Sequence, residues 1–133
     1  MTEQEVFDKL RPLIREVLAV KLEDITMTKT LVTDLGAESI DLLDLSFLIE
    51  DHFGIMLAPN EFESEVRKVL PGGVYEKDGF LTEEALLELR QRLPEVDQGR
   101  LVKGLRKAEL PTLLTIAVFV HLIQRKGGGQ KAC

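Results

Sequence analysis

The chain has 133 residues, of which 44% are hydrophobic, with 17 Lys and Arg against 23 Asp and Glu and a net charge of −6. These values suit one compact domain with a buried core. A single cysteine, Cys133, excludes a disulfide within the chain and favours a reducing compartment.

Two further features bear on location. The acidic start, Met1 to Glu5, has no apolar segment behind it of the kind that secretory signals carry. The longest apolar stretch, Leu113 to Ile123, is 11 residues long, whereas a membrane helix needs about 20. We therefore expect a cytoplasmic protein with no membrane span.

Charge is distributed unevenly. Residues 1–66 contain 15 acids and 5 bases, whereas residues 67–133 contain 8 acids and 12 bases. Between Lys29 and Arg67 there are nine acids and no base. Such a surface repels nucleic acid and anionic membranes and attracts basic proteins.

The first element is a helix from about residue 3 to 19. Thr2 and Glu5 form a capping box, and apolar residues from Val6 to Val17 recur at helical spacing. Pro12 predicts a bend near its middle. Residues 20–37 are typical of a long ordered loop that ends at Gly36.

A second helix is predicted from Ser39 to about Phe53, ended by Gly54. A short third helix over 60–66 is followed by turn signals over 67–78.

Three more helices are expected. One opens at Thr82 and ends before Pro94, and Asp97 caps another that extends through Ala108. The last begins at Pro111 and reaches about Arg125, and residues 127–133 form a flexible tail. No strand pattern of useful length is visible, so the predicted class is all-α.

The helix over 39–53 carries two apolar stripes. One lies within about 80° of arc and faces the core; it contains Leu42, Leu45, Ile49 and Phe53. The second is centred about 130° away and is bordered by Asp44, Glu50 and Asp51; it contains Ile40, Leu43 and Phe47.

The second stripe has two interpretations. Both stripes are buried if the helix is surrounded on all sides. However, unpaired carboxylates are costly to bury, which favours an exposed apolar patch with an acidic rim. That arrangement is typical of a protein docking surface.

Ser39 also has two interpretations. It is either an N-cap serine without further function or an attachment point for a phosphodiester. A helix N-terminus stabilises such an anion. Position alone does not decide between them.

The residues around Ser39 resemble a known family. The run from Asp34 to Leu45, DLGAESIDLLDL, and its continuation from Leu48 to Ile55, LIEDHFGI, resemble the second-helix signature of acyl carrier proteins. The family implies a four-helix bundle whose serine carries 4′-phosphopantetheine, with acyl groups held as thioesters. By this resemblance Ser39 is the attachment residue.

The resemblance also implies partners. Phosphopantetheinyl transferase, acyl-transferring enzymes and synthases with basic surfaces dock on the second helix of the family. Mapped onto this chain, the docking residues are Glu38, Ile40, Asp41, Leu43, Asp44, Phe47, Glu50 and Asp51. Glu38 stands where the family usually has Asp, and Ile40 where it has Leu. We expect a monomer with no nucleic-acid partner.

The resemblance covers about residues 1–66 and 111–126. The intervening segment, about 67–110, is a two-helix insertion before the last helix, within a single domain spanning 1–126. The insertion either enlarges the apolar space that holds acyl chains or is a stabilising surface elaboration.

A basic run lies on the second of these inserted helices and contains Arg100, Lys103, Arg106 and Lys107. This run has three interpretations. It is a solvated face, it pairs with Glu61, Glu63 and Glu65, or it is a patch for a specific partner.

No catalytic or metal-ligating arrangement is present in the sequence. Neither His52 nor His121 has a neighbour at metal-ligand spacing, and no nucleophile and base pair is found. A non-catalytic carrier of fatty acid, specialised lipid or polyketide synthesis is therefore expected. The alternative is an unmodified interaction or regulatory module that uses the acidic helix surface.

Overall fold

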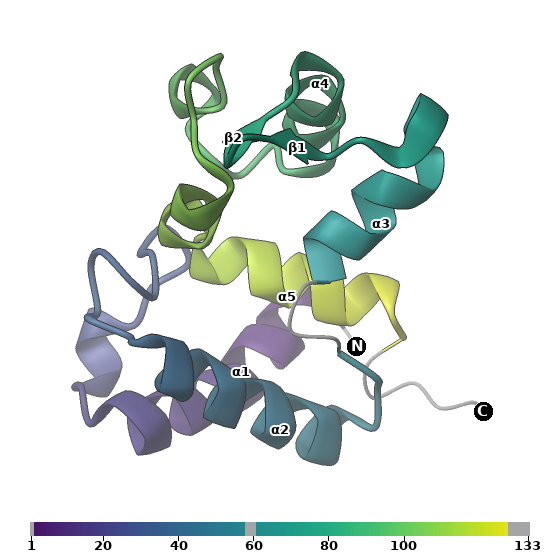
Figure 1. Cartoon of the computed structure of the whole chain (residues 1–133). Coiled ribbons are helices and arrows are strands. Elements are labelled where there is room, and N and C mark those ends of the chain that lie inside the picture. Colours follow the sequence, from purple (N-terminus) through teal and green to yellow (C-terminus); the bar gives the residue numbers. More distant parts are fainter. Residues whose placement is uncertain (1, 58–60, 128–133) are drawn as a thin grey trace. The chain divides into compact units, whose positions relative to one another are not determined.

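The computed structural model describes residues 2–57 and 61–127 (Figure 1). Contacts divide the chain into two compact units, one formed by residues 1–59 with 115–133 and the other by residues 60–114. The structure is mostly helical, which confirms the all-α class. Apart from Gly127, the predicted tail over 127–133 lies outside the described residues.

In the first unit, α1 spans Glu3–Leu18, close to the predicted 3–19. The Thr2 hydroxyl oxygen accepts a hydrogen bond from the Glu5 N–H at 3.1 Å, and the Glu5 carboxylate accepts one from the Thr2 N–H at 2.8 Å. This is the predicted capping box. The helix continues through Pro12 without interruption.

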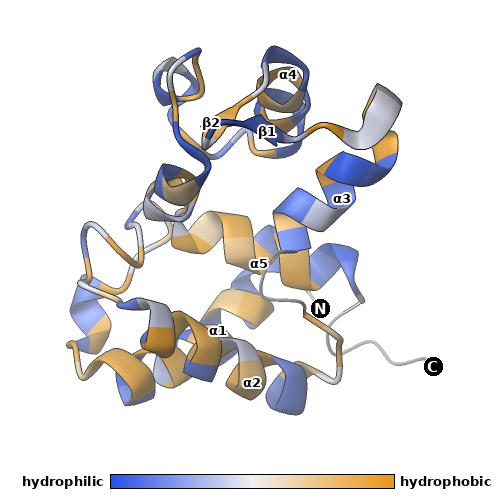
Figure 2. Ribbon diagram, viewed as in Figure 1, coloured by the Kyte–Doolittle hydropathy of each residue, from blue (hydrophilic) through white to orange (hydrophobic). Residues whose placement is uncertain are grey.

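The core of this unit is formed by α1 with α2 (Ser39–Phe53) and α5 (Ile116–Arg125). Helix α1 contacts both of the others. Figure 2 shows α5 as a largely hydrophobic ribbon, in keeping with its five buried aliphatic residues. The Lys9 ammonium lies 5.0 Å from the centre of the Phe53 ring and so joins α1 to the end of α2.

The final helix begins later than predicted. Pro111 lies in a 3₁₀ segment, Lys107–Leu113, and α5 starts only at Ile116. The helix starts late because Thr115 forms an antiparallel bridge with Thr30, in the loop over residues 20–37. That bridge requires extended backbone where the sequence predicts a helix.

In the second unit, α3 spans Glu61–Val69, near the predicted 60–66, and contacts α4 (Glu83–Arg92). The Thr82 hydroxyl accepts a hydrogen bond from the Ala85 N–H, which confirms the predicted start of α4. Between these helices the chain forms a 3₁₀ turn and a short antiparallel hairpin, β1 (Glu76–Lys77) and β2 (Phe80–Leu81). The hairpin is too short to give a sequence pattern of its own.

The prediction of a helix that opens at Asp97 is wrong. A 3₁₀ turn, Gln98–Arg100, forms in its place, and the Asp97 carboxylate accepts a hydrogen bond from the Gly99 N–H. The end of the predicted helix lies in the separate 3₁₀ segment Lys107–Leu113. Gly104 then takes φ = 100°, a left-handed conformation that ends helical structure. Beyond it the chain runs beside β2, where the Leu81 N–H donates to the Leu105 carbonyl at 3.0 Å.

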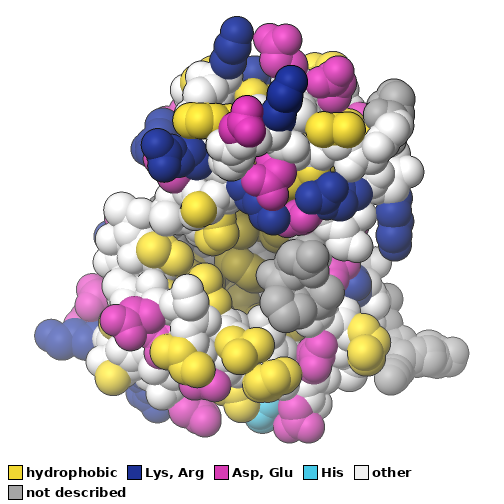
Figure 3. Space-filling view, viewed as in Figure 1, with side chains coloured by type: hydrophobic (Ala, Val, Ile, Leu, Met, Phe, Trp, Pro, Cys, Tyr) yellow, Lys and Arg dark blue, Asp and Glu magenta, His cyan; other side chains and the backbone are white. Residues whose placement is uncertain are grey.

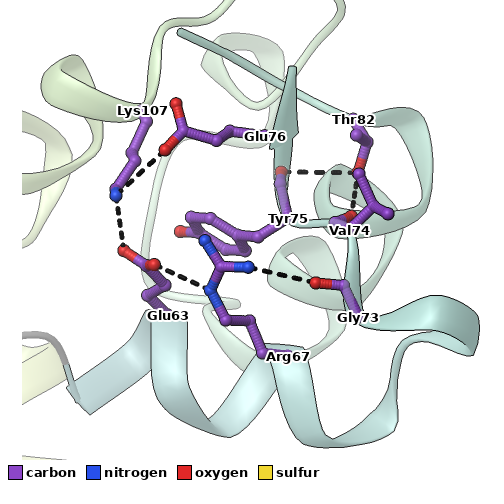
Figure 4. Close-up of polar contacts among 8 residues, drawn as sticks. All are labelled: Glu63, Arg67, Gly73, Val74, Tyr75, Glu76, Thr82 and Lys107. Atoms are coloured by element: carbon purple, nitrogen blue, oxygen red, sulfur yellow. Dashed lines mark hydrogen bonds and ion pairs between the residues drawn. The ribbon is translucent and has the colours of Figure 1, made fainter. Parts of the chain in front are cut away.

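Polar contacts hold this unit together around Tyr75 (Figure 4). Glu63 accepts hydrogen bonds from Arg67 at 2.8 Å and Lys107 at 3.0 Å, and Lys107 also contacts Glu76 at 3.1 Å. The Arg67 guanidinium lies over the Tyr75 ring at 5.4 Å. Burial raises the pKa of the Tyr75 hydroxyl.

The predicted pairing of the basic run with α3 is thus confirmed for Lys107 and Glu63. The prediction that these residues share one helix face is wrong, because the segment forms two separate 3₁₀ stretches with a break at 101–106 rather than one helix. Partial burial opposes ionisation of Glu63, but the hydrogen bonds from Arg67 and Lys107 outweigh it and lower the pKa of this carboxyl below 4.5.

This lowered pKa gives a prediction. A carboxyl whose pKa is depressed by folding stabilises the protein above its unfolded pKa, and the contribution is lost as pH falls through the folded value. We expect Glu63→Gln to lower the free energy of unfolding by about 1 kcal/mol at neutral pH. Its difference from the wild type should shrink as the pH falls below 4.5. Urea denaturation across this pH range measures both effects.

The matched control is Glu84→Gln, which removes an exposed carboxylate on α4. A pH-independent difference between Glu63→Gln and the wild type would contradict the ion-pair explanation.

Candidate functional site

Ser39 is the first residue of α2, and its side chain is exposed. The N-cap position belongs to Glu38, whose N–H donates to the Asp41 carboxylate at 2.9 Å. The interpretation of Ser39 as an N-cap is therefore wrong. Its hydroxyl makes no hydrogen bond with any residue in the described part of the chain, so it is available for chemistry.

The loop before Ser39 is fixed by a reciprocal pair of hydrogen bonds. The Thr30 N–H donates to the Asp34 carboxylate at 2.8 Å, and the Asp34 N–H donates to the Thr30 hydroxyl oxygen at 3.0 Å. The bond from the Thr30 backbone lowers the pKa of Asp34. The Ala37 N–H then donates to the Leu31 carbonyl at 2.9 Å. Hydrogen bonds therefore hold the backbone in place as far as Ala37, two residues before Ser39.

The loop is also anchored to α5. The first two amides of that helix, Ile116 and Ala117, donate to the carbonyls of Lys29 and Met27 at 2.9 and 3.0 Å. Helix N-termini leave such amides without partners inside the helix. Here the loop supplies the acceptors, which ties the segment leading to Ser39 to the core.

The start of α2 suits a phosphodiester on Ser39. The Leu42 N–H donates to the Glu38 carbonyl at 3.0 Å, and the Asp41 N–H donates to the Glu38 side chain. The amides of Ser39 and Ile40, which precede them, have no acceptor within the helix. These amides and the helix dipole favour an anion beside the exposed hydroxyl. The residues present therefore fit a covalently attached phosphate group.

The second apolar stripe of α2 is exposed, as one of its two interpretations predicted. Ile40 and Phe47 are each 58% exposed and Leu43 is 36% exposed, whereas Leu45 is 4% exposed. In Figure 3, hydrophobic and acidic side chains lie next to one another over α2. We call Ile40, Leu43 and Phe47, with Asp44 and Asp51, the α2 surface.

The acidic residues expected to line this surface differ in their surroundings. Asp41 caps the helix through Glu38, and the Glu50 carboxylate accepts a hydrogen bond from the Leu57 N–H at 2.7 Å. Asp44 and Asp51 are exposed and make no ion pair with a described residue. They are therefore the carboxylates best placed to meet a partner.

Met56 is an exposed apolar residue close to α2 that the sequence did not predict as part of this surface. It is 80% exposed and lies between buried Ile55 and Leu57 just after α2. This alternation of buried and exposed residues is typical of an extended segment, and it was the signal available in the sequence.

Among the described residues, no group of three His, Cys, Asp or Glu side chains is placed to hold a metal ion. Within the same residues, no helix has both the length and the apolar character that a membrane span requires.

Residues 8–67 match the family described as the phosphopantetheine attachment site. An acyl carrier protein of Petrotoga mobilis is 33% identical over 63 residues, which are 47% of this chain and 74% of the relative. One of Lactobacillus acidophilus is 36% identical over 63 residues, covering 47% and 79% respectively. One of Coprothermobacter proteolyticus is 28% identical over 82 residues, covering 58% and 100%. No solved structure matches the chain significantly.

Truncation of a side chain should have a large effect on stability in one stripe of α2 and a small effect in the other. Leu45→Ala removes a buried side chain and should lower the free energy of unfolding by about 2–4 kcal/mol. Phe47→Ala removes an exposed ring and should change it by less than about 0.5 kcal/mol. Thermal and urea unfolding of both variants measures this contrast. A comparable loss in Phe47→Ala would show that the ring supports the core.

Proposed function

The chain belongs to the acyl carrier protein family, and on that premise we propose that Ser39 is its attachment residue for 4′-phosphopantetheine. Members of this family are non-catalytic carriers. The observation that carries the proposal is the position of Ser39, which has an exposed hydroxyl at the start of α2 after a loop held by hydrogen bonds.

Modification requires little of the chain itself. The Ser39 oxygen forms a new bond to phosphorus, loses its proton, and displaces the nucleotide part of coenzyme A on a phosphopantetheinyl transferase. The terminal thiol of the attached group holds acyl chains as thioesters. The residues around Ser39 keep its oxygen exposed and favour the negative charge of the phosphodiester.

The α2 surface is the proposed docking site for partner enzymes with basic surfaces. Its apolar side chains contribute affinity, while Asp44 and Asp51 steer and orient the encounter. Asp41 and Glu50 add charge there, although each also holds local structure. The other family-derived docking residue, Glu38, is exposed beside Ser39.

The proposed setting is the cytoplasm, where a monomeric carrier serves synthesis of fatty acids, specialised lipids or polyketides. A single cysteine in 133 residues fits a reducing compartment.

The first prediction of this proposal concerns mass. Incubation with coenzyme A and a broad-specificity phosphopantetheinyl transferase should add one phosphopantetheine group to the wild type and none to Ser39→Ala. Intact-mass spectrometry measures the addition, and Ser46→Ala, on the same helix, serves as the modified control. No addition with several transferases would favour the unmodified interaction module.

The second prediction concerns docking. Asp44→Lys should reduce the kcat/KM of modification about tenfold at low ionic strength, because it reverses a steering charge. The loss should shrink near 1 M salt, where the Debye length is about 3 Å. Glu16→Lys makes the same charge change at an exposed position on α1 and is the control. Equal losses in both variants would indicate an effect of net charge rather than of the α2 surface.

A further inference from the structure

The second unit carries an exposed row of side chains that its packing does not use. Lys77 lies opposite Phe80 in the β1 and β2 register, and Phe80 forms an antiparallel bridge with Arg106. Residues directly opposite one another on neighbouring antiparallel strands share a face of the sheet. Lys77, Phe80 and Arg106 therefore form one row across three segments, which we call the basic aromatic strip.

Hydrogen bonds on both sides fix the pairing of Phe80 with Arg106. The Leu81 N–H donates to the Leu105 carbonyl at 3.0 Å, and the Lys107 N–H donates to the Gly79 carbonyl at 2.9 Å. A pair enclosed in this way has closely spaced side chains. The Arg106 guanidinium accordingly lies over the Phe80 ring, 5.3 Å from its centre.

The opposite face of this small sheet is directed inward. Leu81 is 5% exposed, and Glu76 contacts Lys107, which also pairs with Glu63 of α3. The strip is thus the outer face. Phe80 on it is 41% exposed.

The cations of the strip differ from those around them. Arg67, Arg92 and Lys107 each form ion pairs within the unit. Lys77 and Arg106 are exposed and make no ion pair with any described residue.

Both charged side chains of the strip, Lys77 and Arg106, are cations. Arg100 and Lys103 are exposed in the segment that leads to it. The nearby acids are Asp78, in the hairpin turn, and Glu109, whose carboxylate accepts a hydrogen bond from the Arg106 N–H at 3.0 Å. Unpaired cations beside an exposed ring complement carboxylates that flank an apolar side chain.

We propose that the basic aromatic strip binds an acidic protein segment that also bears aromatic or aliphatic side chains. A nucleic-acid partner is disfavoured by the net charge of −6 and by the run of nine acids without a base between Lys29 and Arg67. The strip has the opposite sign to the α2 surface. Its partner therefore differs in chemistry from the basic enzymes proposed to dock on α2, and its binding does not depend on Ser39.

The test uses the full chain labelled with ¹⁵N and a synthetic peptide that alternates Glu with Phe and Leu. Binding should shift the amide signals of residues 77–81 and 102–107. Arg106→Glu and Lys77→Glu should each weaken binding about tenfold, the change expected for loss of a charge-assisted contact. Phe80→Ala should weaken it as well, and added salt should reduce the affinity for the wild type.

The matched control is Lys68→Glu, which reverses an exposed cation on α3 outside the strip. Arg106→Gln and Lys77→Gln repeat the measurement without introducing new charge, and amide spectra of the free variants verify their folding. The proposal is overturned if the peptide shifts no strip residue, or if Lys68→Glu weakens binding as much as Arg106→Glu. It is also overturned if a thymidine oligonucleotide binds the strip more tightly than the peptide.

Discussion

Backbone hydrogen bonds between the 27–30 segment and the start of α5 organise the first compact unit. Met27 and Lys29 accept from the first amides of α5, and Thr30 pairs with Thr115. Thr30 also exchanges hydrogen bonds with Asp34, so the anchored loop continues toward Ser39. The position of the proposed attachment residue is therefore set by segments almost 90 residues apart in sequence.

Helix α2 combines a structural and an exposed face in 15 residues. Its buried side chains pack in the core beside α1. Burial of such side chains contributes about 1.5–3 kcal/mol each. The helix therefore does not need its second stripe for stability, which leaves Ile40, Leu43 and Phe47 available for contacts with other proteins. A carrier requires this division, since partners must reach the helix without disturbing its packing.

The second unit shows how two cations adjacent in sequence come to lie on opposite faces of a small sheet. Lys107 lies on the face with Glu63 and Glu76 and pairs with both of them beside buried Tyr75. Arg106, the adjacent residue, lies on the outer face over Phe80. The alternation of side chains along an extended segment accounts for this separation. Lys107 is thereby used within the unit, whereas Arg106 is left exposed on its surface.

The sequence by itself determined α1, α2 and α4, because residues that start or stop helices and the spacing of apolar residues are local signals. In α1 the apolar spacing continues past Pro12, and so does the helix. It also predicted the exposed stripe, since acidic neighbours are costly to bury. Only the tertiary structure decided that Glu38 caps α2, that α5 starts at Ile116, and that the segment after Asp97 runs beside β2. Cap choice depends on backbone geometry, and the other two features depend on hydrogen bonds between distant segments, which no local pattern records.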